Sequence, residues 1–281
     1  MAILAAAGAG AQALAAAAGA PAAEGLSAAP APAPALASPW AVTDQGEVRL
    51  VSAVAGTGEV QELRLGLEFK LKPGWKIYWR SPGAAGFPPH LDWTGSENLA
   101  AATMAWPAPR RFSVLGLDTL GYHDAVVFPL TVRPSTPAAP LKLALKVDYL
   151  TCKDICIPYT AALALDVPAG PAAATAYTQL IDRYAAQVPG DGQAAGLAIE
   201  GARITGSSAR PVLEVEAVAR EPFAKPELFV EGPSQLDFAA PSTALSEGGH
   251  RAILRLGIGT VAKAFPDWSQ VPLTVTLVDG A

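Results

Sequence analysis

Apolar and polar residues alternate with a period of two along most of the chain after Trp40, and this pattern constrains the fold more than any other feature. Successive side chains of a β-strand point to opposite faces, so a strand with one buried face shows this alternation. The longest alternating runs are residues 63–71, 141–149 and 161–167. In each run an apolar side chain occupies every second position. We therefore predict strands there, each with one face in a core and the other in water.

Shorter apolar runs predict further strands between these. They lie at 48–51, 76–80, 99–106 and 126–132. Turn-forming sequences separate them at Lys72-Pro73-Gly74 and at Ser81-Pro82-Gly83. The 26 glycines and 26 prolines also favour many short strands over a helical bundle. About eight short strands with polar turns predict an antiparallel β-sandwich of the immunoglobulin type.

A helix and a second alternating region follow. The sequence Pro168-Ala169-Gly170-Pro171 predicts a linker, and Pro189-Gly190 predicts the end of a helix. Apolar residues between them recur at helical spacing, at Tyr177, Leu180, Ile181, Tyr184 and Val188. We expect this helix to pack against one of the sandwiches. Alternation then returns around Leu213–Glu216, Ile253 and Leu273–Leu277 and predicts a second, smaller sandwich.

The predicted fold is therefore all-β, with two immunoglobulin-like antiparallel β-sandwich domains joined by a linker with one amphipathic helix. The expected boundaries are a signal-like, Ala/Pro-rich disordered segment over 1–39, a first sandwich over 40–168, a linker and helix over 169–190, and a second sandwich over 191–281.

The first 39 residues contain 20 alanines and a single charged residue, Glu24. An apolar stretch followed by small-x-small sequences is typical of a secretory signal, so we expect export. No Lys or Arg precedes Arg49, so the cationic start of such a signal is absent and an Ala-rich tail remains the alternative. The weakly apolar Ala and Gly residues, interrupted by Gln12 and Pro21, argue against a transmembrane anchor.

The net charge of −5 argues against nucleic acid as a partner, since such proteins carry a basic surplus. Hydrolase chemistry is unsupported, because the chain has no Gly-x-Ser-x-Gly, no phosphate-cradling glycine loop and no His-Glu-x-x-His. We expect no cofactor and no metal site. His90 and His123 are the only nearby histidines that could complete a zinc site with two cysteines, and neither has a second ligand at suitable spacing.

Cys152 and Cys156, the two cysteines of the chain, carry the functional argument. They lie where the strand ending at Tyr149 must reverse into the strand beginning near Ala161, so their side chains come within bridging distance. A loop of about five residues gives a disulfide only ~2 kcal/mol of stabilisation on the chain-entropy model. Short-loop disulfides are also more easily attacked by thiolates. Lys153 favours a neighbouring thiolate and Asp154 opposes it. A redox disulfide, a structural disulfide and a Cu(I) site all remain open from spacing alone.

Three ordered motifs resemble the periplasmic N-terminal region of the DsbD-type thiol–disulfide interchange proteins, and within that family the ScsB branch, named for suppression of copper sensitivity. They are the runs 72–83, 112–116 with 121–124, and 148–158. The resemblance is strong over 40–168 and extends in layout through the second sandwich.

The resemblance implies a periplasmic immunoglobulin-like domain with a reversible cysteine pair and no membrane span of its own. Such a domain receives electrons from a transmembrane reductase domain of the same or a parent protein and passes them to periplasmic thioredoxin-fold proteins. It implies that Cys156 forms the mixed disulfide with partners and that Cys152 resolves it. It also implies that a loop over the pair shields it, here Ser113, Val114, Leu115 and Gly116.

The chain departs from the family pattern in two ways. Three residues separate the cysteines, fewer than in the best-known members, and Val114 or Leu115 stands where those members have an aromatic cap. The tyrosines that flank the site in the family correspond to the region of Tyr78 and Trp79. Further expected site neighbours are Tyr149, Lys153, Asp154 and Pro158. The hypothesis is therefore a protein-disulfide reductase relay domain that needs an external electron donor. The alternatives are a non-catalytic docking scaffold with a structural disulfide and a Cu(I)-binding copper-tolerance domain.

Overall fold

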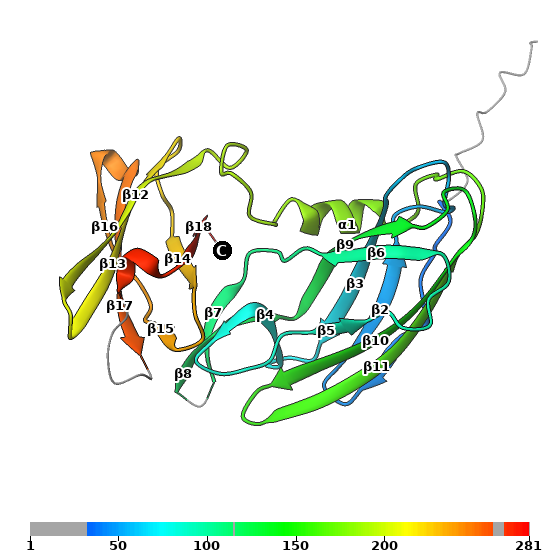
Figure 1. The fold of residues 1–281 in the computed structure, drawn as a ribbon, viewed down its shortest axis with the longest axis horizontal. Coiled ribbons are helices and arrows are strands. Elements are labelled where there is room, and N and C mark those ends of the chain that lie inside the picture. Colours follow the sequence, from blue (N-terminus) through cyan, green and yellow to red (C-terminus); the bar gives the residue numbers. More distant parts are fainter. Residues whose placement is uncertain (1–32, 115, 261–266, 281) are drawn as a thin grey trace, which may run out of the picture. The chain divides into compact units, whose positions relative to one another are not determined.

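The structure, a computed structural model, describes residues 33–114, 116–260 and 267–280. This part of the chain is almost entirely β-structure with one α-helix, and all its paired strands are antiparallel (Figure 1). The predicted all-β fold is thereby confirmed. The signal-like segment falls on residues 1–32, outside the described residues.

Two antiparallel sheets form the first sandwich. One has the order β1 (Ala41–Thr43), β2 (Gly46–Ser52), β3 (Leu63–Leu71), β9 (Ala125–Pro134) and β6 (Leu99–Met104). The other has the order β11 (Cys156–Val167), β10 (Leu141–Cys152), β4 (Lys76–Gly83), β8 (Leu117–His123) and β7 (Arg110–Val114), with β5 (His90–Asp92) paired to β10. The long hairpin of β10 and β11 therefore lies at one edge of the second sheet.

The alternating residues of these strands meet in one core. Alternate residues of β3 and β10 are buried together in this core. They include Leu63, Leu65, Leu67 and Phe69 of β3 and the fully buried Val147 of β10. The ring of Phe69 packs edge-on against Phe128 and Tyr149. At ~1.5–3 kcal/mol for each large apolar side chain removed from water, this core supplies most of the stabilisation of the sandwich.

Helix α1 (Thr178–Ala185) covers the outer face of the β2–β3–β9 sheet, as predicted for a packed strut (Figure 1). Ile181 is buried there against Val51 and Val127. Gly66 makes this close approach possible, because a Cβ at that position would lie 2.6 Å from Cγ1 of Val127 and 3.2 Å from Cγ1 of Ile181.

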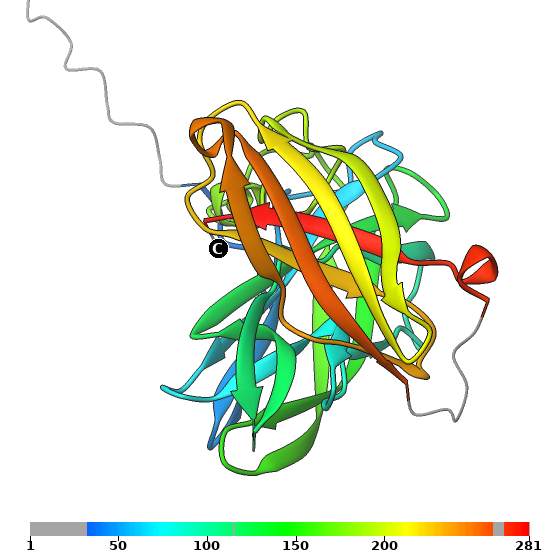
Figure 2. The same ribbon diagram turned by 90° about the vertical axis from the view of Figure 1, so that its left-hand side faces the viewer.

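The second sandwich pairs a large sheet with a two-stranded sheet (Figure 2). The large sheet has the order β12 (Leu197–Ser207), β13 (Arg210–Ala219), β17 (Arg251–Thr260) and β15 (Leu236–Phe238), with β16 (Ser242–Ser246) also paired to β17. The small sheet consists of β14 (Pro226–Glu231) and β18 (Thr274–Asp279). Leu213, Val215 and Leu254 of the large sheet pack against Leu228 and Val230 of the small one.

Two local predictions need correction. The turn expected at Ser81-Pro82-Gly83 is part of β4, whose pairing with β8 is irregular between Tyr78 and Gly83 and so tolerates a proline. The boundary at Trp40 is too late, because Ala37 already pairs with Val51 and Ser38 is buried. The Ser38 hydroxyl accepts a hydrogen bond from the Leu50 amide, which ties this segment to β2.

No helix in residues 33–114, 116–260 and 267–280 has the length and hydropathy that a membrane crossing requires.

Candidate functional site: a disulfide at a hairpin tip

Cys152 and Cys156 form a disulfide across the tip of the β10–β11 hairpin. The strands pair residue by residue from Leu141 and Val167 down to the two cysteines, whose Cα atoms are 4.2 Å apart. The core-facing alternation of both strands sets this register, because a shift by one residue would turn every apolar side chain outward. The three residues between the cysteines form the turn, in which the Lys153 amide donates to the Ile155 carbonyl.

The two cysteines differ sharply in exposure. Cys152 is completely buried, whereas Cys156 is exposed at the start of β11. Cys152 forms a small apolar cluster with Tyr78 of β4, and Phe112 of β7 and Leu150 of β10 pack against it. Solvent therefore reaches the disulfide from the side of Cys156, and Cys152 lies on its protected side.

Tyr78 contacts both halves of the disulfide. Its ring is fully buried beside Cys152, and its hydroxyl oxygen lies 3.7 Å from Sγ of Cys156. Gly86 accommodates the ring, because a Cβ at that position would lie 2.3 Å from it. Gly121 of β8 pairs with Tyr78 and allows the close approach of the β4 backbone, since a Cβ there would lie 2.1 Å from the Ile77 carbonyl oxygen. Burial raises the pKa of Tyr78, so the hydroxyl remains protonated and able to donate a hydrogen bond at physiological pH.

Charged side chains border this cluster without entering it. Lys76 pairs with Cys152 across the strands, and its ammonium lies 4.8 Å from the centroid of the Phe112 ring. Lys153 lies over Gly74, in the turn that precedes β4. Both residues of the turn that were expected to influence the thiols, Lys153 and Asp154, are exposed. Their effect on the sulfurs therefore stays a prediction.

The remaining predicted neighbours divide into two groups. Trp79 points into the core, where it packs against Phe229, and Tyr149 points into the same core against Phe69 and Tyr159. Burial raises the pKa of Tyr149 to about 12. These two side chains support the sandwich rather than touch the sulfurs. Pro158 pairs with Leu150 and lines an open groove of about 380 Å³ along the β10–β11 hairpin.

The predicted cap corresponds to the tip of the β7–β8 hairpin. Ser113 pairs with Asp118, and Gly116 has a positive φ of 81° in the turn. Leu115 and the side chain of Val114 lie outside the described residues. Shielding by these four residues therefore stays a prediction, and Cys156 is exposed in the structure.

Sequence reasoning did not assign Phe112 and Leu150 to the site. Phe112 is the aromatic residue that packs on the buried side of the disulfide, with its ring centroid 6.3 Å from that of Tyr78. Its place at the start of the second motif, two positions before Val114, was the available signal.

In the part of the chain that the structure describes, no three His, Cys, Asp or Glu side chains come together as a metal site. His123 instead contacts Asp124, with Nδ1 2.6 Å from the carboxylate, and Arg110 on its other side.

Comparison with known proteins finds a family match for each of the two sandwiches. Residues 47–168 match the family described as thiol:disulfide interchange protein DsbD, N-terminal, and residues 187–281 match a domain of unknown function, DUF8393. No protein with a curated description matches the chain. The N-terminal periplasmic domain of ScsB from Proteus mirabilis has the same fold, with a TM-score of 0.66 and 24% identity over 88% of this chain and 94% of that one. The reduced N-terminal domain of Neisseria meningitidis DsbD gives a TM-score of 0.26 and 12% identity over 46% of this chain and 89% of that one.

The disulfide lies within the residues that match this thiol:disulfide interchange family, and the two findings together support a thiol–disulfide exchange module. The first sandwich is similar to DsbD-type N-terminal domains, and the fold of the chain through both sandwiches is similar to that of the ScsB periplasmic domain. The resemblance drawn from the three sequence motifs is confirmed.

Proposed function

We propose that this chain relays electrons from a membrane-embedded reductase domain, of the same or a parent protein, to thioredoxin-fold proteins in the periplasm. One observation supports this proposal above the others. The disulfide presents Cys156 to solvent and keeps Cys152 buried, as expected of a pair in which one sulfur meets partners and the other resolves.

Loading begins when a thiolate of the donor attacks Sγ of Cys156. The Cys152–Cys156 bond breaks, a donor–Cys156 disulfide forms, and Cys152 leaves as a thiolate that takes up a proton. The second donor thiol, as a thiolate, then attacks the donor sulfur of this mixed disulfide and releases Cys156. The donor ends as a disulfide and the pair as two thiols, so two electrons and two protons have been transferred.

Delivery runs through the same sulfur. The Cys156 thiolate attacks a partner disulfide, forms a mixed disulfide and releases one partner thiol. Cys152 then attacks Cys156 as a thiolate, re-forms the internal disulfide and releases the second partner thiol. Formation of the internal bond needs little movement, because hairpin pairing holds the two Cα atoms close together. The hydroxyl of Tyr78 is placed to donate a hydrogen bond to the Cys156 thiolate.

Apolar surface next to Cys156 is suited to a protein partner. Ile155, in the hairpin turn, is 61% exposed, and Phe87, which lines the groove with Leu150 and Pro158, is 48% exposed. Exposed apolar side chains that cluster at a reactive group are typical of interaction sites. We therefore place the docking of the thioredoxin-fold partner over the turn and this groove.

A trapping experiment tests the proposal. The full chain with Cys152→Ser is reduced and mixed with a thioredoxin-fold probe, a thioredoxin that keeps only its exposed active-site cysteine, activated as a mixed disulfide with thionitrobenzoate. We expect a stable mixed disulfide through Cys156, because the resolving thiol is absent. The matched Cys156→Ser variant should trap none, because its remaining thiol is buried.

A redox titration of the unmodified chain distinguishes a redox-active disulfide from a structural one. Free thiols are counted by mass-tagged alkylation in buffers of graded dithiol to disulfide ratio. A relay requires a reversible transition above about −300 mV, the range below which structural disulfides lie. A pair that stays oxidised below that potential would make the chain a docking scaffold with a structural disulfide.

A further inference from the structure

Strand β14 presents a different set of residues to each sandwich. Leu228 and Val230 face the core of the second sandwich, to which the strand belongs. The alternate residues Glu227, Phe229 and Glu231 contact the first sandwich. Phe229 is only 1% exposed and belongs to the core of the first sandwich. Because successive side chains of a strand point to opposite faces, one strand can join both cores.

Two arginines of the first sandwich bind the carboxylates on either side of Phe229. Arg80 of β4 donates two hydrogen bonds to Glu231, from Nε at 2.8 Å and from Nη2 at 2.7 Å. Arg111 of β7 donates from Nη2 to Glu227 at 3.2 Å and to the Leu228 carbonyl at 3.1 Å. The four charged side chains are 16% to 33% exposed, so solvent screens these pairs less than it screens fully exposed ones. We call these four residues the arginine clamp.

The arginines of the clamp lie on β4 and β7, the two strands whose aromatic side chains cover Cys152. Arg80 follows Tyr78 by two residues in β4, and Arg111 directly precedes Phe112 in β7. Tyr78 and Phe112 are the aromatic residues that pack around Cys152. A strand advances by about 3.3 Å per residue, so each clamped arginine lies within about 7 Å along the chain of the ring it would steady. Figure 1 shows β14 and β18 next to β7, between that strand and the large sheet of the second sandwich.

We infer that the second sandwich is a positioning element for the redox site: through the arginine clamp it holds Tyr78 and Phe112 over Cys152 and so limits access to the buried thiol. Arg80, Arg111, Glu227 and Glu231 are positioning residues, since no described contact joins them to a sulfur. The inference deepens the proposed function, because a protected Cys152 directs partners to Cys156. Displacement of β14 would loosen β4 and β7 together and expose the resolving thiol.

Access to Cys152 can be measured without any redox partner. In the full chain with Cys156→Ser, Cys152 is the single thiol, and its rate of alkylation by iodoacetamide reports its exposure. We expect the Glu227→Ala/Glu231→Ala double variant to raise this rate by about tenfold, equivalent to about 1.4 kcal/mol. Exchanging the charges at one pair, with Arg111→Glu and Glu227→Arg, should keep the rate within about twofold of the parent, a difference of about 0.4 kcal/mol.

Two controls separate the clamp from general loosening. The Glu200→Ala/Glu216→Ala variant removes two arginine-bound carboxylates from the large sheet of the second sandwich. It should leave the alkylation rate of Cys152 unchanged. Val215→Ala weakens the core of the second sandwich without touching the clamp. Three results would overturn the inference. The alkylation rate could stay unchanged in the Glu227→Ala/Glu231→Ala variant, or rise equally in either control. The charge-exchanged variant could also react as fast as the double alanine variant. The alkylation assay contains no redox partner, so its result is independent of the trapping experiment on Cys156. Either the positioning role or the proposed relay can therefore be disproved while the other stands.

Discussion

At the scale of single residues, Tyr78 contacts the two cysteines of the disulfide through different parts of its side chain. The ring of Tyr78 excludes water from Cys152, whereas its hydroxyl reaches Cys156, 3.7 Å away. Gly86 leaves the space that this ring occupies. The burial that raises the pKa of Tyr78 also keeps the hydroxyl in its donor form.

Replacement of Tyr78 by phenylalanine should slow the chemistry of Cys156 and leave the fold intact. The reduced Cys156 thiolate would lose a hydrogen-bond donor, and one such bond contributes about 0.5–1 kcal/mol, or about a two- to fivefold change. We expect alkylation of Cys156 at pH 7, measured in the Cys152→Ser background, to slow by about that factor. Tyr149→Phe is the matched control, since that hydroxyl lies on the core side of the same hairpin. Equal slowing in both variants would remove Tyr78 from the mechanism.

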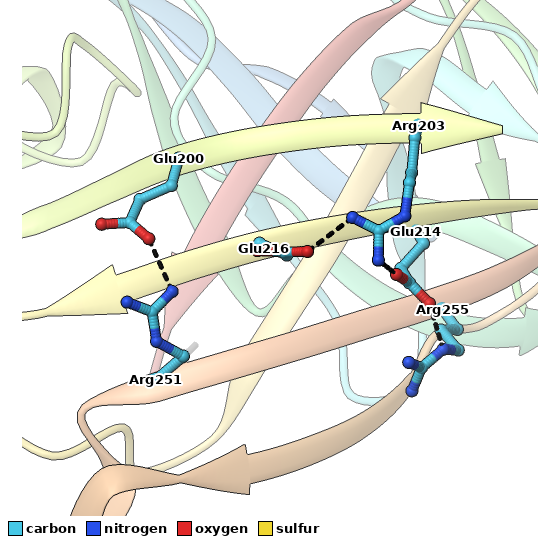
Figure 3. A network of polar contacts seen from close by, with 6 residues as sticks. All are labelled: Glu200, Arg203, Glu214, Glu216, Arg251 and Arg255. Carbon is cyan, nitrogen blue, oxygen red and sulfur yellow. Dashed lines mark hydrogen bonds and ion pairs between the residues drawn. The ribbon is translucent and has the colours of Figure 1, made fainter.

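At the scale of elements, the second sandwich keeps the outer face of its large sheet polar through an ion-pair network (Figure 3). Arg203 of β12, Glu214 of β13 and Arg255 of β17 stand directly opposite one another across three strands. Glu214 accepts hydrogen bonds from both arginines, and its side chain is only 7% exposed. Arg203 also binds Glu216, and Arg251 binds Glu200 nearby. Opposite charges in such cross-strand positions stabilise the pairing of the strands.

Glu214 should therefore contribute more to stability than the other carboxylates of this face. We expect Glu214→Ala to lower the free energy of unfolding by about 1–2 kcal/mol, because two arginine contacts are lost at a buried position. Glu200→Ala, at an exposed pair with Arg251, should cost less than about 0.5 kcal/mol. Urea denaturation of the two variants measures both values. Similar losses of unfolding free energy in the two variants would show that burial of Glu214 does not increase its contribution to stability.

At the scale of the whole molecule, the second sandwich completes the core of the first. Phe229 of β14 packs on Trp79 with ring centroids 6.0 Å apart, and Val278 of β18 packs against the same core. The guanidinium of Arg80 lies over the Trp79 ring, 4.4 Å from its centroid. The first sandwich is thus assembled from residues of both sequence matches.

A chain that ends at residue 190 should consequently be less stable than the full chain. It would lose Phe229 and leave Trp79, Arg80 and Arg111 without their partners, a loss comparable to the ~3–5 kcal/mol of a buried Phe→Ala substitution. Thermal denaturation of residues 33–190 against residues 33–281 measures the difference. Phe229→Ala in the full chain should account for most of it. If residues 33–190 unfold at the same temperature as the longer chain, the first sandwich is complete by itself.

Most of the β-structure was predictable because its signal is local. A strand with one wet face shows its period within a few residues, so β3, β10 and β11 could be located from Leu63, Leu141 and Leu163 onward. The position of the cysteines at a hairpin tip followed from the same pattern. The segment Glu227-Leu228-Phe229-Val230-Glu231 was harder to interpret, because both of its faces contact protein and its partners lie far away in the sequence. Arg80 and Glu231, for example, are 151 residues apart.

The sequence by itself determined an all-β chain with its two cysteines at the tip of one hairpin, since strand periodicity and turn residues act over short distances. Only the tertiary structure decided which cysteine is buried, because the side chains around Cys152 come from β4 and β7 as well as β10. It alone decided that β14 serves two cores. Both outcomes depend on strand order and on contacts between distant segments, which local periodicity does not encode.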